Sequence, residues 1–327
     1  MADSEDTVLS QYVPGFRANL NLAPQQTDTR LLSGVDGDLA YDTPGQMFNA
    51  DDVQTSDPEI ITSRVPQTPD KFPGFTRRVG IFVPFQDAAW IDNVDKAREL
   101  VDPTNKVMMS LMAGRWRFVD TTILGTTAGV GGLLGKAPTK LDASGAITYQ
   151  ALPAAQIVAS TDVSFAHDAE IVPIDGSQYG LSVGKLLHAM EILDESELEG
   201  PRHLALSSQQ KTDLLRRTPV TSRYYADVEA LVKGELDEFL DFNIHRLQKA
   251  RIPSAGLGHD NASAIRQCVA WIEGACVYRG RPITDARIRI RPDRSDTPQA
   301  FYKTEHGSVR RYDTAVVEID CYEGAQY

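Results

Sequence analysis

Residues 125–140 of the chain, GTTAGVGGLLGKAPTK, contain the glycines and the Gly-Lys pair of a loop that could bind a phosphate. The phosphate-binding motif requires a glycine five residues before the Gly-Lys pair, and a hydroxyl residue after the lysine to reach Mg²⁺. At those two positions this chain has Val130 and Ala137. We therefore do not expect it to bind a nucleotide.

Ser182 and Lys185 have the S-x-x-K spacing of a class of serine hydrolases, in which the lysine helps to deprotonate the serine. The S-D-N and K-T-G motifs that accompany it in those enzymes do not occur in the sequence. Ser182 also stands directly before an apolar helical pattern, where a serine commonly caps the helix. We expect no catalytic residues and keep the serine hydrolase as the least favoured alternative.

The sequence HDAE at residues 167–170 offers three types of metal ligand, but neighbouring residues of a strand point to opposite faces. The histidines show neither H-E-x-x-H nor H-x-H spacing; they are His167, His188, His203, His245, His259 and His306. His188 lies within a predicted helix, where we expect it to be half-buried. We predict neither a metal site nor a cofactor.

The predicted strand at residues 284–291 carries the strongest basic concentration. Its arginines are Arg287, Arg289 and Arg291, and Arg294 and the pair Arg310-Arg311 follow in the sequence. Such a strand can contact phosphates or an acidic protein surface, or it can be the solvated face of an edge strand. The formal net charge of −12, from 45 acidic and 33 basic residues, favours contact with protein over DNA. A nucleic-acid-binding function through these arginines remains an alternative.

The composition fits one large or two ordinary domains, since the chain has 327 residues, and its 18 prolines and 24 glycines indicate many loops. Cys268, Cys276 and Cys321 form no C-x-x-C pair, so we expect reduced, buried thiols. The acidic N-terminus does not have the pattern of a signal peptide, and the longest uncharged run, at 121–135, is too short to span a bilayer. We expect a protein without membrane contact in a reducing cytoplasm.

The spacing of the apolar residues predicts an α+β fold. We expect a strand at 77–85, a long helix at 103–124, a second helix after Ser182, a strand at 202–207 and a helix at 208–217, followed by strands near 242–247, at 284–291 and at 315–321. The apolar stripe of the long helix consists of Met108, Met112, Trp116, Val119 and Ile123. The first strand should place Val79, Ile81, Val83 and Phe85 on one face.

Residues 34–75 contain closely spaced turn signals, from DGD at 36–38 to FPGF at 72–75, and are too long for an ordinary connection. Such a segment buries little surface by itself. It can lie over neighbouring copies of the chain, where association compensates the loss of conformational entropy. Because no catalytic group is expected either, the sequence favours a self-assembling structural component.

Three blocks of the sequence resemble the major capsid proteins of tailed bacteriophages with the Hong Kong 97-like fold. The first, RRVGIFVPFQDAAWIDNVDKARELVDPTNKVMMSLMAGRWRFVDTTILGT, combines an Arg-Arg strand, an aspartate-rich turn, a helix that starts at Asp-Pro and a glycine-rich loop. The others are GLSVGKLLHAMEILDESELEGPRHLALSSQQKTDLLRR through VKGELDEFLDFNIHRL, and RIRIRPDRSDTPQAFYKTEHGSVRRYDTAVVEIDC. They cover the larger part of the chain in the order of the family.

The resemblance implies an N-terminal arm at residues 1–33, an E-loop hairpin at 34–80, a peripheral domain at 81–175 and 280–327, and an axial domain at 176–279. The helix at 103–124 is then the spine helix of the peripheral domain. The implied protein is not an enzyme; it forms hexamers and pentamers of the icosahedral virion capsid and is assembled in the cytoplasm of the host bacterium. Its implied partners are other copies of the chain, a portal protein and a separate scaffolding protein, with a decoration (cement) protein as a further option. Double-stranded DNA is enclosed but not specifically bound.

Two departures from relatives refine these expectations. Some relatives begin with a charged helical scaffolding segment, and no such segment is present in this sequence, which is why a separate scaffolding protein is expected. Some relatives crosslink through a lysine and an asparagine, but no family motif marks Lys71 or Asn49 as reactive, so we expect non-covalent joints. The expected contacts between subunits are made by charged residues: Asp51, Asp52, Asp57, Glu59, Arg64, Lys71, Arg77, Arg78, Arg287, Arg289 and Arg291.

Overall fold

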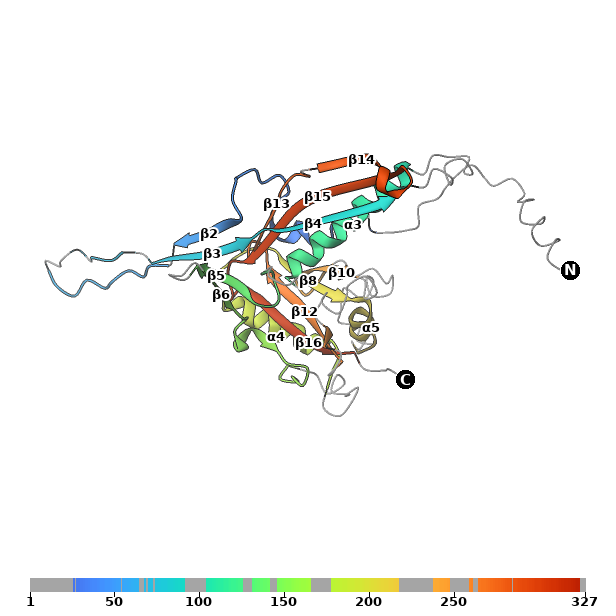
Figure 1. Cartoon of the computed structure of the whole chain (residues 1–327). Coiled ribbons are helices and arrows are strands. Elements are labelled where there is room, and N and C mark those ends of the chain that lie inside the picture. Colours follow the sequence, from blue (N-terminus) through green and yellow to red (C-terminus); the bar gives the residue numbers. More distant parts are fainter. Residues whose placement is uncertain are drawn as a thin grey trace. The chain divides into compact units, whose positions relative to one another are not determined.

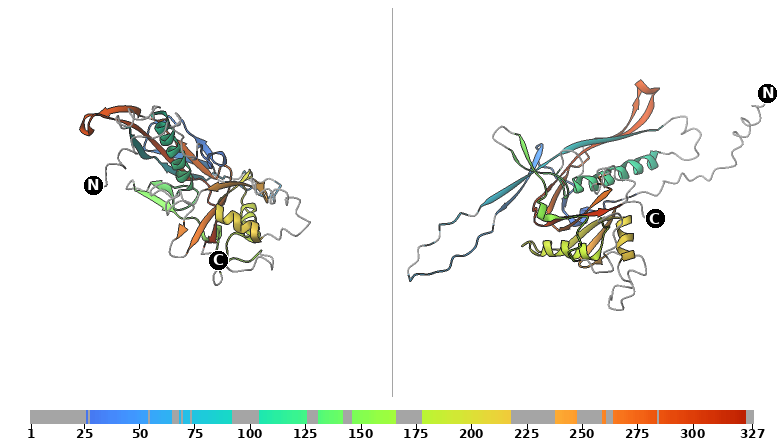
Figure 2. Two further views of the ribbon diagram at one scale, coloured as in Figure 1. Left: turned by 90° about the vertical axis from the view of Figure 1, so that its right-hand side faces the viewer. Right: turned by 90° about the horizontal axis from the view of Figure 1, so that it is seen from below.

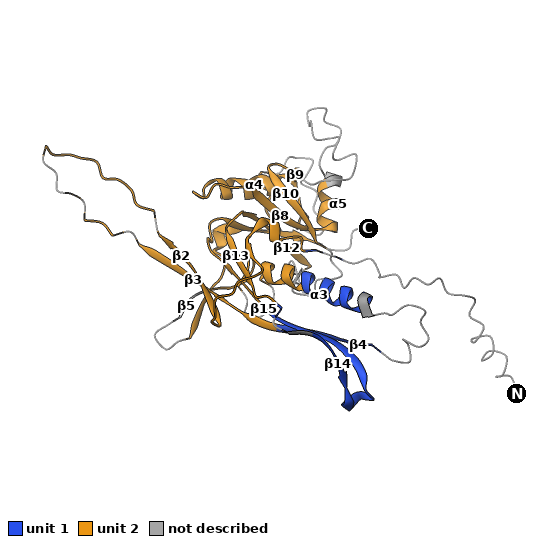
Figure 3. Ribbon diagram, turned by 90° about the horizontal axis from the view of Figure 1, so that it is seen from above, with its two compact units in different colours: residues 1–28, 85–117, 283–304 blue, residues 29–84, 118–282, 305–327 orange. Residues whose placement is uncertain are grey.

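A computed structural model gives the structure of residues 26, 28–53, 55–64, 68, 70–72, 74–91, 104–125, 131–141, 146–165, 178–217, 238–247, 259–260, 264–283 and 285–323. Within this part of the chain, several β-sheets are combined with three α-helices, which confirms the expected α+β class (Figure 1). The chain divides into unit 1, residues 1–28, 85–117 and 283–304, and unit 2, residues 29–84, 118–282 and 305–327 (Figure 3). The boundaries of arm, E-loop, peripheral domain and axial domain remain predictions.

Unit 1 is a sheet that packs against a helix. Strand β14 (Asp285–Arg291) pairs antiparallel with the first half of β15 (Thr297–Arg310), and strand β4 (Val83–Trp90) also pairs with β15. Helix α3 (Thr104–Leu124) contributes to the apolar core of this unit. The buried residues of that core are Ile91, Leu111, Ala300 and Tyr302.

Helix α3 confirms the long helix predicted at residues 103–124. Of the predicted apolar stripe, Val119 and Ile123 are fully buried. The other members are only half-buried; they are Met108, Met112 and Trp116. In that half of the helix the buried member of the core is Leu111, one position before Met112 in the sequence, and Met108 packs against the same core from a half-buried position. The pattern of the largest apolar residues therefore located the helix correctly and its buried face only in part.

The strand predicted at residues 77–85 is two strands. Strand β3 (Phe75–Ile81) ends before Phe82, and β4 begins after it. The side chain of Phe82 is buried, with its ring centroid 5.2 Å from that of Phe48 and 5.8 Å from that of Tyr41. Because Phe82 turns inward, the predicted alternation on a single face does not continue from β3 into β4.

Unit 2 contains a seven-stranded mixed sheet in the order β7-β16-β12-β8-β10-β9, with β11 beside β12. Its strands are β7 (Ile157–Val158), β8 (Arg202–Ser207), β9 (Glu238–Phe239), β10 (Phe242–Leu247), β11 (His259–Asp260), β12 (Ile265–Ile272) and β16 (Val316–Tyr322). The strands predicted at 202–207, near 242–247 and at 315–321 are thereby confirmed. Cys268 and Cys321 in this sheet, and Cys276 outside it, are buried free thiols, as expected.

Helices α4 (Val183–Asp194) and α5 (Ser208–Arg217) confirm the two helices predicted for this part of the chain. Helix α4 packs against β16 and β12, with Leu186 and Leu193 buried. Among the described residues, no helix is long and apolar enough to cross a membrane.

Unit 2 also contains three smaller strand pairings. Strand β1 (Asp36–Asp38) pairs in parallel with β13 (Cys276–Gly280), which in turn pairs with the second half of β15. Strand β5 (Ala137–Leu141) pairs with β6 (Ile147–Gln150), and β3 forms a hairpin with β2 (Met47–Val53).

Strand β16 contains a carboxyl group that weakens the fold at neutral pH. Burial, together with the charge of Asp320, raises the pKa of Glu318 from 4.5 to about 7. The unfolded chain keeps the ordinary pKa, so between these two values the carboxyl ionises in the unfolded state and stays protonated in the folded state. The stability that the protonated group contributes is therefore fully present at low pH and is lost as the pH rises through this window.

We expect Glu318→Gln to stabilise the protein at pH 8 by about 1–3 kcal/mol, because the amide replaces the protonated carboxyl and carries no charge. Urea unfolding at pH 5 and pH 8 measures the effect. The gain should fall below about 1 kcal/mol at pH 5, which lies only just above the unfolded-state pKa of 4.5. Glu191→Gln, at an exposed position of α4, is the control and should change stability by less than about 0.5 kcal/mol. Equal stability of Glu318→Gln and the natural chain at pH 8 contradicts the prediction.

Candidate functional site

The candidate functional site is the β2–β3 hairpin. Its ladder runs from Met47 opposite Ile81 to Val53 opposite Phe75. The two chain segments that continue beyond Val53 and Phe75 extend away from the sheets of unit 2 (Figure 2). Their described residues, 55–64, 68, 70–72 and 74, contain no strand. The hairpin is therefore paired at its base and extended beyond it.

Large apolar side chains are exposed along this hairpin. Their exposed fractions range from 61% to 90%; they are Val53, Ile60, Ile61, Phe72 and Phe75. Contact with water is unfavourable for such side chains, by about 25 cal/mol for each Å² of apolar surface left uncovered. A set of large apolar side chains among charged residues is typical of a surface that binds another protein.

Charged residues on the exposed side of the hairpin, in the ladder and beyond it, form pairs within the chain. Arg77 Nε lies 2.7 Å from Asp51 Oδ1, and Lys71 Nζ lies 2.8 Å from Glu59 Oε1. Exposed pairs of this kind contribute about 0–1 kcal/mol each, because water and salt screen them. The predicted contact residues that are exposed on the hairpin are Asp51, Asp57, Glu59, Arg64, Lys71 and Arg77.

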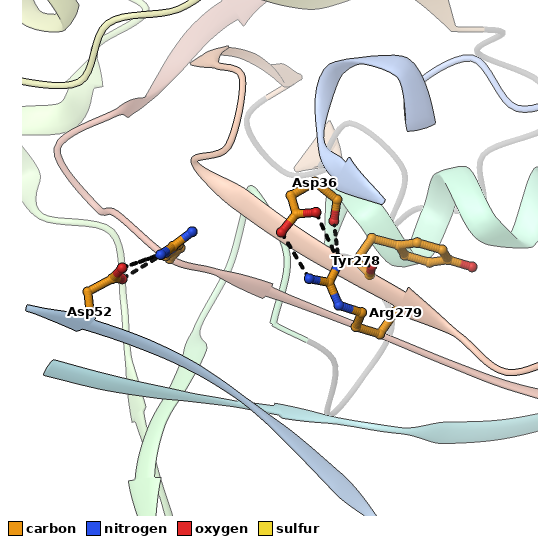
Figure 4. A network of polar contacts seen from close by, with 5 residues as sticks. Asp36, Asp52, Tyr278 and Arg279 are labelled. Carbon is orange, nitrogen blue, oxygen red and sulfur yellow. Dashed lines mark hydrogen bonds and ion pairs between the residues drawn. The ribbon is translucent and has the colours of Figure 1, made fainter. Parts of the chain in front are cut away.

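Charged residues at the base of the hairpin have partners in the body of unit 2. The carboxylate of Asp52, labelled in Figure 4, accepts hydrogen bonds from other residues of unit 2. Arg311 Nε donates to both of its oxygens, at 2.9 and 2.8 Å, and the Tyr312 hydroxyl donates to Oδ1 at 2.9 Å. The hydrogen bond from Arg311 lowers the pKa of Asp52, against the opposing effect of burial. Asp52 is therefore an ionised anchor that ties β2 to the turn between β15 and β16.

A second anchor is built around Asp313. Its carboxylate accepts hydrogen bonds from Arg78 of β3, at 2.6 Å, and from Arg310, at 2.5 Å. The side chain of Arg310 is fully buried and also donates to the carbonyl oxygens of Leu133 at 3.2 Å and of Gln150 at 3.3 Å. The base of the hairpin is thus joined to the loop after α3 and to the end of β6.

The sequence predicted Asp52 and Arg78 as residues that contact another subunit. The structure gives both of them partners in the same chain, and their contact with another subunit remains a prediction. Asp313, the partner of Arg78, was missed because an isolated aspartate in a turn carries no sequence signal. The pair Arg310-Arg311 was noted only as a basic concentration. This basic pair and the acidic residues of strand β2 carry opposite charges, and that complementarity is the signal that could have located the anchor.

The predicted basic strand is confirmed as β14, and its arginines are exposed. Arg291 Nε lies 2.8 Å from Asp293 Oδ1, and Arg287 and Arg289 are exposed as well. Ile288 and Ile290 between them are 48% and 66% exposed. Contact of these arginines with another subunit remains a prediction.

The glycine-rich stretch closes the C-terminal end of α3. Leu133 N–H donates to the carbonyl of Ile123 at 3.0 Å, and Leu134 N–H to that of Leu124 at 2.9 Å. A side chain at Gly132 has no room, since its Cβ would lie 2.3 Å from the Ile123 oxygen. A helix C-terminus carries partial negative charge, whereas phosphates bind at helix N-termini. This location agrees with the sequence argument against a nucleotide site.

Lys185 has a structural role in unit 2. Its side chain is 2% exposed, and Nζ donates to the backbone oxygens of Ser160, Tyr179 and Asp320, at 3.1, 3.1 and 2.7 Å. Ser182 caps α4, as predicted, by accepting a hydrogen bond from the Lys185 backbone N–H at 3.3 Å. An ammonium group whose three N–H groups are engaged in this way has no lone pair with which to deprotonate a serine.

The remaining candidates do not converge on a site in the described residues. His188 is half-buried, as predicted, and bonds to Asp162 through Nδ1. The HDAE sequence at 167–170 lies outside the described residues. Among the described residues, no cluster of histidine, cysteine and acidic side chains has the form of a metal site.

The comparisons with known proteins agree with one another. A sequence model of the phage capsid protein family matches residues 8–323. A chain of the cyanophage Pam1 capsid has a similar fold, with a TM-score of 0.65, 10% identity and 100% of both chains covered. For the capsid of Ralstonia phage GP4 the TM-score is 0.64, the identity 12% and the coverage 97% of both chains. For cyanophage P-SCSP1u they are 0.63, 14%, and 97% of this chain with 95% of that chain. These likenesses confirm the fold expected from the resemblance. No curated protein sequence matches the chain at a significant level.

We expect Asp52→Asn to loosen the base of the hairpin, because it removes the charge that holds Arg311 and Tyr312. Hydrogen exchange of the β2–β3 ladder amides should become roughly tenfold faster, which corresponds to about 1.4 kcal/mol, close to the lower end of the range for a charge-assisted hydrogen bond. Asp51→Asn is the matched control, since the adjacent pair with Arg77 is exposed, and should change exchange less than about twofold. Equal exchange in the two variants contradicts the anchor.

Proposed function

Because this chain belongs to the phage capsid protein family, we propose that its copies assemble as hexamers and pentamers in which the β2–β3 hairpin of one copy docks on its neighbours. The chain is a major capsid protein of a bacteriophage, a structural protein of the icosahedral shell with the Hong Kong 97-like fold. Three points are our proposal: that the hairpin docks on a neighbouring copy, which residues make that contact, and that the copies form hexamers and pentamers.

The observation that carries the docking proposal is the exposure of apolar residues on the hairpin. Ile60 is 89% exposed and Phe72 90% exposed. Exposed ion pairs contribute too little to hold a shell together, so the apolar side chains must supply most of the contact free energy. The charged residues around them then fix the register of the contact. We retain Asp51, Asp57, Glu59, Arg64, Lys71 and Arg77 as the charged contact residues of the hairpin.

The anchored base gives the contact a defined direction. A hairpin that is fixed by Asp52 and Asp313 and extended beyond Val53 places its apolar residues on a surface of the next copy. Such a contact joins different surfaces of two copies, and a heterologous contact of this kind closes into rings of five or six when the rotation between copies allows it. In this proposal residues 34–80 are the E-loop, 1–33 the arm, 176–279 the axial domain, and 81–175 with 280–327 the peripheral domain.

We propose further partners on the basis of the family. They are a portal protein and a separate scaffolding protein, with a decoration protein as an option, and assembly takes place in the host cytoplasm. The net charge of −12 supports a shell that encloses double-stranded DNA without binding it specifically. The structural role of Lys185 supports a protein that is not an enzyme.

Electron microscopy of purified protein tests the docking proposal. The natural chain, expressed with its neighbouring genes, should form shells, tubes or rings. The double variant Ile60→Ser, Phe72→Ser should remain monomeric at the same concentration, because it removes the apolar contact surface. Val163→Ser is the control, since Val163 is 38% exposed outside the hairpin, and should assemble normally. Normal assembly of the double variant contradicts the docking surface.

We also expect the joints between subunits to be non-covalent. Denaturing gels of mature particles should show a single band near the mass of the chain, 35.9 kDa. A ladder of multimers contradicts this expectation and directs attention to Lys71 and Asn49.

A further inference from the structure

Residues 30–38 form a strap that is fixed to unit 2 along its length. At one end, the backbone N–H groups of Arg30 and Leu31 donate to Asp120 Oδ1 of α3, at 3.0 and 3.3 Å. At the other end, Arg279 Nη2 lies 2.9 Å from Asp36 Oδ2, and β1 pairs with β13 (Figure 4). The strap joins residues 1–28 of the chain to the remainder of unit 2.

The middle of the strap lies on a stack of three aromatic rings. His203 of β8 and His245 of β10 stack on Trp271 of β12, with ring centroids 5.5 and 5.7 Å from that of Trp271. Trp271 Nε1–H donates to the carbonyl of Gly34 at 2.6 Å. A Cβ at Gly34 would lie 2.9 Å from His203 Cγ, so the strap backbone is in direct contact with the stack.

The two histidines share one hydrogen bond. Nδ1 of His203 and Nε2 of His245 are 2.9 Å apart, and His245 also bonds to the backbone of Arg30. If His245 donates from Nδ1 to the Arg30 carbonyl, its Nε2 must accept from His203 Nδ1–H. Nε2 of His203 is then the free lone pair, and in the structure it is buried without a hydrogen-bond partner. Both rings are neutral in this arrangement.

We propose that His203 and His245 form an acid-sensitive latch that holds the strap while both rings are neutral and releases it when one of them is protonated. The proposal does not depend on how the chain assembles.

A proton has no favourable place in the latch. On His245 Nε2 it meets the N–H of His203, and the shared hydrogen bond breaks. If the proton binds to His203 Nε2 instead, it creates a buried N–H group that has no hydrogen-bond acceptor. The carboxylates that hold the strap are already engaged, Asp120 by strap amides and Asp36 by Arg279. The other charged groups of the strap, β8, β10 and β12 are the carboxylate of Asp38, which accepts a hydrogen bond from the Ala40 N–H, and the cations Arg30, Arg202, Arg246 and Arg266. Among the described residues, neither ring forms an ion pair with a carboxylate that would compensate the added charge; the polar contacts of the rings are with each other and with the Arg30 backbone.

The direction of the pKa shifts agrees with this geometry. Burial lowers the pKa of His203, and burial together with the charge of His203 lowers the pKa of His245 to about 4. The unfolded chain has the ordinary value of 6.5, so the stability contributed by the neutral rings is fully present above that pH. It is lost progressively as the pH falls from 6.5 towards 4.

Hydrogen exchange at pH 7 and pH 5, corrected for the intrinsic rate, tests the latch in the full-length protein. Peptides from residues 30–38 should lose protection by about tenfold or more at pH 5, since each proton taken up on opening changes the equilibrium by up to tenfold per pH unit. Peptides from the β12–β16 ladder should keep their protection, which distinguishes local release from global unfolding.

In the double variant His203→Gln, His245→Gln the loss of protection on acidification should disappear, because the amides can donate and accept hydrogen bonds without titrating. Each single variant should lose only part of the pH effect, because the other ring still titrates. His188→Gln is the control: this histidine bonds to Asp162, away from the strap, so its replacement should leave the pH effect intact. Equal protection of the strap at pH 7 and pH 5 in the natural chain overturns the latch. An unchanged pH effect in the double variant His203→Gln, His245→Gln overturns it as well.

Discussion

The buried guanidinium of Arg310 is the group on which the described geometry of unit 2 depends. It binds Asp313 and the carbonyls of Leu133 and Gln150, which belong to the turn after β15, the loop after α3 and the end of β6. A buried cation that loses a partner costs about 3–5 kcal/mol, so these segments must keep their places together. Through Asp313 the same cluster holds Arg78 of β3. The direction of the hairpin is thereby decided inside the subunit.

The hairpin has opposite physical properties at its two ends. Its base has buried or half-buried ion pairs and the aromatic cluster around Phe48 and Phe82, and it is therefore well fixed. Its extended part exposes side chains such as Ile60 that gain stability only by contact with another molecule. A fixed base reduces the conformational entropy that a contact with a neighbouring copy has to overcome. Substitutions of the exposed apolar residues should then affect assembly, whereas substitutions at the base should affect the stability of the subunit.

The two short motifs that suggested chemistry are explained by their positions in the fold. In the described part of the glycine-rich stretch, which follows α3, the N–H groups of Leu133 and Leu134 bond to carbonyls of the helix and are not available to a phosphate. In S-x-x-K, the serine hydroxyl caps α4, and the lysine reaches past it to three backbone carbonyls. Motifs of this length specify residue types but not the end of a helix or the direction of a side chain, and those decide the chemistry.

The sequence by itself determined the α+β class, the helices α3, α4 and α5, the strands β8, β10 and β16 of the seven-stranded sheet and, through resemblance, the family. These follow from local periodicity, capping residues and ordered blocks, which can be read along the chain. Only the tertiary structure decided that Phe82 divides one predicted strand into two, that Asp52 and Arg78 bind Arg311 and Asp313, and that His203 lies against His245. Those pairs join residues far apart in sequence, so their contacts and their electrostatics exist only when packing brings the strands together. Local pattern specifies the elements, whereas burial and long-range pairing specify which charged residues hold the subunit and which remain for its neighbours.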